Sequence, residues 1–134
     1  MFLRIIRYAF LTLIPLFASC MEWEYGLEEE FNIPQGNGLF ICNEGNFQYG
    51  NATLSYYDSQ SNVVQNEVFY RSNAMKLGDV CQSMVIRDGI GWVVVNNSHV
   101  IFAIDINTFK EVGRNKNLTS PRYIHFLSDE KGYV

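Results

Sequence analysis

The chain has 134 residues, of which 18% are charged and 15% are aromatic, and its formal net charge is -4. This length fits roughly one domain, the aromatic content excludes a disordered chain, and the acidic balance argues against nucleic-acid binding. Three cysteines are too few for a disulfide scaffold.

Residues 1–19 are predicted to be a lipoprotein signal peptide. Arg4 and Arg7 precede an apolar run at residues 8–17, which is shorter than the ~20 residues of a membrane span. The sequence Phe-Ala-Ser-Cys that ends at Cys20 resembles a bacterial lipobox. The resemblance implies that Cys20 becomes the lipidated first residue of the mature chain. An ordinary signal peptide with an incidental cysteine and a true membrane helix are the alternatives.

Residues 20–37 are predicted to be an acidic tether, with acids at Glu22, Glu24, Glu28, Glu29 and Glu30. A run of like charge is often a flexible, solvated linker. Behind a lipidated cysteine it also resembles the surface-export signal of Bacteroidetes lipoproteins. That resemblance implies an outer-membrane protein, exposed at the cell surface, that contacts the membrane only through its lipid anchor.

Residues 38–134 are predicted to be all-β, because short runs rich in Val, Ile, Phe and Tyr alternate with turn-forming Asp, Asn and Gly. The expected strands are residues 38–43, 52–58, 63–70, 81–87, 91–96, 100–105, 108–113 and 123–128. A further strand is expected to begin at Tyr133. Regular short strands of this kind build a sandwich, a barrel or a propeller.

An internal repeat favours the propeller. Residues 83–93 match residues 124–134, each with an apolar strand, a turn containing Asp and then Gly, an aromatic residue and Val. Two further strands end in Asp58 and Asp105, and residues 38–43 match residues 91–96. A period of about 40–50 residues with four strands is typical of one propeller blade.

Residues 120–134 carry a family resemblance. Their sequence, Ser-Pro-Arg-Tyr-Ile-His-Phe-Leu-Ser-Asp-Glu-Lys-Gly-Tyr-Val, resembles the repeat of bacterial YncE-like and surface-layer-type β-propellers, and residues 101–105 with Thr108 match its later part. Residues 38–134 are especially similar to YncE-like lipoproteins of gut Bacteroidetes. The resemblance implies blades of four antiparallel strands. About two of a typical seven are expected here, as the N-terminal part of a protein of about 350 residues. A small self-contained β domain is the alternative.

No motif in the sequence points to catalysis. His99 and His125 lack the spacing of a zinc site, and the chain has no Cys-x-x-Cys, no nucleophile elbow and no phosphate-binding loop. We therefore expect neither an enzyme nor a bound metal or cofactor. Cys42 and Cys81 are expected as two buried thiols, with a disulfide as the alternative in an oxidising compartment.

Ligand binding is the expected activity, because the connections that would crowd one face of the propeller are polar and aromatic. The candidate ligand-binding residues are Phe47, Tyr49, Lys76, Asn96, Asn97, His99 and Arg122. Aromatic rings beside amides suit a sugar or another small molecule, although turn formation alone also accounts for Asn and Gly.

Two classes of function follow. The family resemblance implies a surface-tethered propeller that captures a nutrient, a small molecule or glycan such as a corrinoid, for a TonB-type transporter in the outer membrane. The other class is a scaffold or adhesion propeller that binds protein partners.

Overall fold

The computed structural model describes residues 37–134. The predicted signal peptide, Cys20 and residues 21–36 of the predicted tether lie outside the described residues. No helix within residues 37–134 has the length and apolar character needed to cross a bilayer. The described residues consist of antiparallel strands and one short helix, which confirms the predicted all-β class.

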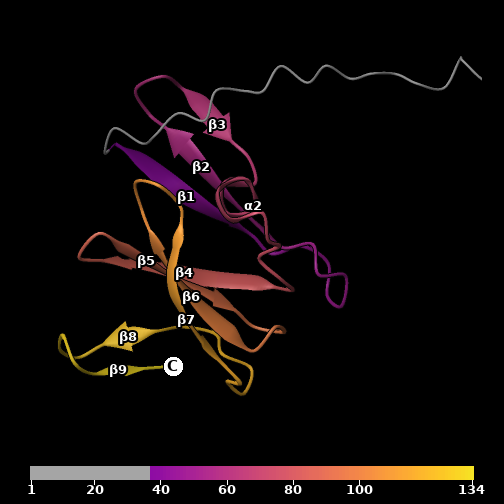
Figure 1. The fold of residues 1–134 in the computed structure, drawn as a ribbon, viewed down its shortest axis with the longest axis vertical. Coiled ribbons are helices and arrows are strands. Elements are labelled where there is room, and N and C mark those ends of the chain that lie inside the picture. Colours follow the sequence, from indigo (N-terminus) through magenta and orange to yellow (C-terminus); the bar gives the residue numbers. More distant parts are fainter. Residues whose placement is uncertain (1–36) are drawn as a thin grey trace, which may run out of the picture. The chain divides into compact units, whose positions relative to one another are not determined.

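The strands form three antiparallel sheets that follow one another along the chain (Figure 1). The first sheet has the order β1 (Gly38–Asn43), β2 (Thr53–Asp58), β3 (Val63–Gln65). The second has the order β4 (Cys81–Arg87), β5 (Ile90–Val95), β6 (Val100–Asp105), β7 (Glu111–Lys116). The third pairs β8 (His125–Phe126) with β9 (Gly132–Tyr133).

The central strands of the second sheet, β5 and β6, are covered on both faces. Side chains of successive strand residues point to opposite faces, yet Val93, Val94 and Val95 are all buried, as is every residue from Val100 to Ile104. Runs of buried apolar residues without alternation are typical of strands that lie between two layers.

One face of the second sheet packs against the first sheet and its helix. Phe109, which follows β6, has its ring centroid 5.6 Å from that of Phe40 in β1 and 5.5 Å from that of Tyr56 in β2. Phe69 packs on Phe102 with the ring centroids 4.9 Å apart. These aromatic rings form a core shared by the two sheets.

The third sheet also contacts the second. The ring centroids of Trp92 in β5 and Phe126 in β8 lie 5.3 Å apart. The guanidinium of Arg87 lies over the Phe126 ring, donates a 2.8 Å hydrogen bond to the backbone oxygen of Ser128 and forms an ion pair with Asp129. The second sheet is thus joined to both neighbours along the chain.

The predicted strand over residues 63–70 is wrong in its second half. β3 ends at Gln65, and the helix α2 (Val68–Asn73) follows. Glu67 at its start and Ala74 at its end both have positive φ angles, of 54° and 50°. The adjacent residues Val68 and Phe69 are both buried. In a strand with one covered face, adjacent side chains point to opposite faces, and only one of the two would be buried. Tertiary burial decided between helix and strand for this short apolar run.

The last strand of the second sheet begins later than predicted. The expected range was 108–113, whereas β7 runs from Glu111 to Lys116. The carboxylate of Asp105 accepts hydrogen bonds from the backbone N–H groups of Asn107 and Thr108, at 2.9 and 2.8 Å. These bonds hold Thr108 in a turn. The predicted strand 123–128 is likewise shorter, because only His125 and Phe126 pair with β9.

Candidate functional site

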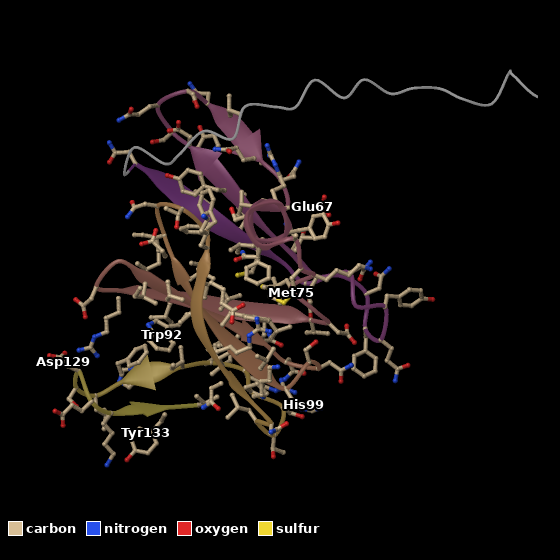
Figure 2. All side chains as sticks on the ribbon, viewed as in Figure 1. Glu67, Met75, Trp92, His99, Asp129 and Tyr133 are labelled. Carbon is tan, nitrogen blue, oxygen red and sulfur yellow. The ribbon has the colours of Figure 1, made fainter. Side chains whose placement is uncertain are left out.

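Four connections meet at one end of the sheets, because alternate connections of an antiparallel meander emerge at the same end. We call them the loop face. They are residues 44–51, 74–80, 96–99 and 117–124. Figure 2 shows His99, which belongs to this face, on the side of the described residues away from Asp129.

Asp79 joins three of these connections. One carboxylate oxygen, Oδ2, accepts hydrogen bonds from the backbone N–H of Gln48 at 2.8 Å and from the side-chain amide of Asn97. The backbone N–H of Asp79 donates to the hydroxyl of Ser98 at 2.8 Å. Asp79 is only 8% exposed, and its Oδ1 atom is buried without a hydrogen-bond partner among residues 37–134. The loops are therefore held together by a buried carboxylate.

Gly78 allows the close approach of these loops. Its φ angle is 131°, a conformation that favours glycine, and a Cβ atom at this position would lie 2.4 Å from the hydroxyl oxygen of Ser98. Its backbone oxygen accepts a 3.0 Å hydrogen bond from the N–H of Ala52 at the end of the first loop. A side chain at position 78 would separate the connections.

Asn96 and His99 link the third connection to the fourth. The side-chain amide of Asn96 donates to the backbone oxygen of Pro121 at 2.9 Å. The backbone oxygen of His99 accepts from the N–H of Leu118 at 3.1 Å, and its Nδ1 atom accepts from the N–H of Ser120 at 3.4 Å. The side chains of Asn96 and Asn97 thus bridge loops, which is a structural role whether or not they also contact a ligand.

Phe47 and Tyr49 project from the first loop into solvent. Their exposed fractions are 62% and 75%. The backbone around them is fixed, since the N–H of Gln48 binds Asp79 and the N–H of Tyr49 donates to the backbone oxygen of Asn46 at 3.0 Å. Two exposed rings on an anchored backbone have area available for contact with a partner.

Lys76 lines a cavity of about 200 Å³ where the first two connections meet α2. The cavity wall combines opposite charges with aromatic rings, and its residues are Gly50, Asn51, Ala52, Thr53, Glu67, Phe69, Tyr70, Lys76 and Leu77. Arg122 instead lines a separate hollow with residues 118–121, Tyr123 and Val134. The structure therefore places the two cations of the predicted site in different depressions.

No three of the His, Cys, Asp or Glu side chains in the described part of the chain lie close enough together to hold a metal ion. His125, which the sequence places in a strand, is exposed in β8.

Asp79, Tyr70 and Glu67 were not among the predicted site residues. The pattern Leu-Gly-Asp-Val-Cys at residues 77–81 was a usable signal for Asp79, because an acid between apolar residues that lead into a buried strand requires hydrogen-bond partners. Glu67 and Tyr70 were missed because a strand was expected there, whereas the start of α2 brings both into the wall of the cavity that Lys76 also lines.

Comparison with known proteins gives a family without an assigned activity. Residues 37–134 match the family model described as Domain of unknown function (DUF5074). The search of curated proteins found no match.

Proposed function

The chain belongs to the DUF5074 family, and from that premise we propose that residues 37–134 are successive blades of a β-propeller whose loop face binds a ligand. In this proposal the second sheet is a complete blade of four strands. The first sheet is a blade in which α2 follows a short third strand, and the third sheet begins another blade.

Three features support the propeller. The strands of each sheet pair in chain order, as they do in a blade. The central strands of the second sheet are covered on both faces, as in a blade between two neighbours. The strands β2 and β6 end in equivalent carboxylates, Asp58 and Asp105, and each of these binds the turn that follows it.

The observation that carries the binding function is the hydrogen-bonded loop face with its two exposed rings. A loop that is already ordered loses little conformational entropy on binding. Phe47 and Tyr49 offer flat apolar area, and the nearby cavity adds the ammonium of Lys76 and the carboxylate of Glu67. Flat rings beside charged and amide groups suit a small molecule or glycan that is both planar and polar.

We place this non-catalytic protein at the cell surface. Cys20 is the lipidated residue that anchors the chain in the outer membrane, and the ligand is a nutrient, such as a corrinoid, that passes to a TonB-type transporter. Labelling of cells with radioactive palmitate tests the anchor. The label should be lost with Cys20→Ala and kept with the matched control Cys42→Ala, and label that persists on Cys20→Ala contradicts the proposal.

Equilibrium dialysis of the full chain tests ligand binding, with cyanocobalamin and a panel of oligosaccharides as probes. We expect saturable binding of one probe class, and we expect Phe47→Ala combined with Tyr49→Ala to weaken it by about tenfold, at ~1 kcal/mol or less per ring. Tyr133→Ala is the matched control, because Tyr133 is an exposed ring outside the loop face. Its affinity should equal that of the unmodified chain.

A scaffold that binds a protein partner is the second candidate. The cavity of about 200 Å³ is smaller than the ~300–1,000 Å³ of typical small-molecule sites, and two protruding rings also fit a protein surface. Failure of every probe to bind contradicts nutrient capture. If site-specific photocross-linking from position 47 in intact cells then yields one protein adduct, the scaffold function is the correct one.

A further inference from the structure

Cys42 and Cys81 meet between the first and second sheets. Cys42 belongs to β1 and Cys81 is the first residue of β4, and these two strands lie against each other. Neither cysteine forms a disulfide, and the two thiols lie close enough for each to shift the pKa of the other. Two sulfur atoms from different sheets are therefore neighbours across an interface that no backbone hydrogen-bond ladder joins.

The two thiols differ in accessibility. Cys81 is 2% exposed, whereas Cys42 is half-buried and can be reached from solvent. The hydrogen bond from Cys81 lowers the pKa of the Cys42 thiol. The same contact, together with burial, raises the pKa of the Cys81 thiol. Because the thiolate is the nucleophile in sulfur exchange, Cys42 is the reactive member, and Cys81 keeps the proton that stabilises it.

We propose that Cys42 and Cys81 are a redox-active dithiol that closes into a disulfide between the first and second sheets. The oxidant is an external disulfide, either a small molecule or a protein. The Cys42 thiolate attacks one sulfur of that disulfide, forms a mixed disulfide and releases the other sulfur as a thiol.

Cys81 then completes the exchange. Its sulfur attacks the Cys42 sulfur, the bond from Cys42 to the external sulfur breaks, and a second external thiol leaves with the proton of Cys81. The dithiol has lost two electrons and two protons, and the external disulfide has become two thiols. The bond that forms closes a loop of roughly 40 residues between the sheets, which restricts the unfolded chain.

Glutathione disulfide is the probe for the first test. The experiment uses the full chain with Cys20→Ser, so that only Cys42 and Cys81 react. Intact-mass spectrometry should show the loss of two hydrogen atoms without a glutathione adduct, and the thermal midpoint should rise by about 10 °C or more. A stable adduct on the dithiol chain, or a disulfide that leaves the midpoint unchanged, overturns the proposal.

Single replacements in the same background test the roles of the two sulfurs. With Cys81→Ser the mixed disulfide at Cys42 should accumulate, because no resolving thiol remains. With Cys42→Ser the adduct at Cys81 should form at least about tenfold more slowly, since that sulfur is buried and protonated. Equal rates, or faster reaction of Cys81, contradict the assignment. Circular dichroism of each variant establishes that both are folded.

Discussion

The first and second sheets are both antiparallel and both have their strands in chain order, and they differ in how they end. The second sheet ends in a full strand, β7, that pairs with β6. In the first sheet β3 has three residues, and α2 follows it and packs on the second sheet through Phe69. The comparison teaches that a helix can follow the third strand in one sheet and a strand in the other, while the two sheets still pack together.

Phe109 is the residue through which the two sheets depend on each other. It belongs to the second sheet's last connection, yet its ring contacts Phe40 and Tyr56 of the first. Asn73 links the first sheet's helix to the second sheet. It belongs to α2, yet its amide binds backbone groups of the second sheet. Neither sheet completes its own packing.

Replacement of Phe109 by alanine should give the largest effect. The side chain is fully buried, and loss of a buried phenylalanine lowers the free energy of unfolding by about 3–5 kcal/mol. Urea unfolding measures this loss. Phe47→Ala is the matched control, because Phe47 is exposed, and it should change the free energy by less than about 0.5 kcal/mol. A small effect of Phe109→Ala means that the sheets do not share a core.

Asn73→Ala separates the contribution of the helix from that of the rings. The Asn73 amide donates to the backbone oxygens of Phe69 and Phe109, at 2.7 and 3.0 Å, and its oxygen accepts from the N–H of Glu111 at 2.8 Å. We expect a loss of about 2 kcal/mol in urea unfolding, because these backbone groups lose their partners. Asn115→Ala, an exposed asparagine of β7, should be nearly neutral. Equal effects of the two replacements contradict the bridging role of Asn73.

Sequence patterns located the first three strands of the second sheet well, because turn residues bound each of them, whereas β7 begins three residues later than predicted. The ranges 81–87 and 100–105 were predicted with the bounds of β4 and β6. The elements of the first sheet were harder to predict from the sequence. Residues 68–70 are an apolar run whose helical or extended state depends on what covers it, and Phe102 of the other sheet supplies that cover.

The alignment of the repeats was also displaced by one residue. The sequence matched Gly38 with Gly91, but Gly38 lies opposite Asp58 whereas Ile90 lies opposite Asp105. Strand register therefore equates Gly38 with Ile90. A shift of one residue exchanges the two faces of a strand, and composition alone does not reveal it, because β5 is apolar on both faces.

The candidate site was predictable as a set of loops but not as contacts. The antiparallel order places residues 47, 49, 96, 97 and 99 at one end. The buried carboxylate of Asp79 and the separation of Lys76 from Arg122 depend on loop conformation. That conformation requires the φ angle of 131° at Gly78.

Asp79→Ala tests whether the loop face is one unit that spans both sheets. The backbone N–H of Gln48 and the amide of Asn97 lose their acceptor, which should cost about 1–3 kcal/mol locally. Hydrogen exchange of the Gln48 amide should accelerate by about tenfold, with little change in the β6 amides. Asp88→Ala is the control, because Asp88 is an exposed acid in the β4–β5 turn. Unchanged protection of Gln48 contradicts the linkage.

Replacement of Asp58 or Asp105 should change stability least. The two residues compare the sheets directly, because Asp58 ends β2 in the first sheet and Asp105 ends β6 in the second. Hydrogen bonds from the backbone N–H of Gln60 and the hydroxyl of Ser61 lower the pKa of Asp58. Bonds from the backbone N–H and hydroxyl of Thr108 and from the N–H of Asn107 lower the pKa of Asp105. Both carboxylates are thus ionised more readily in the folded chain than in the unfolded chain.

The pH dependence follows from these two lowered pKa values. Each acid stabilises the fold fully above its unfolded pKa of about 3.9, and this stabilisation is lost as the pH falls through the lower, folded pKa. The free energy of unfolding, measured in urea between pH 6 and pH 2, should therefore decrease on acidification.

Asp58→Asn and Asp105→Asn should each make the free energy of unfolding less dependent on pH, and by a similar amount. Each turn is bound in the same way, and both carboxylates are exposed to screening by water. Asp129→Asn, which removes an exposed carboxylate outside both turns, is the control. A slope that responds to Asp105→Asn but not to Asp58→Asn means that the two turns are not equivalent, and the match between residues 54–58 and 101–105 then does not extend to their function in the fold.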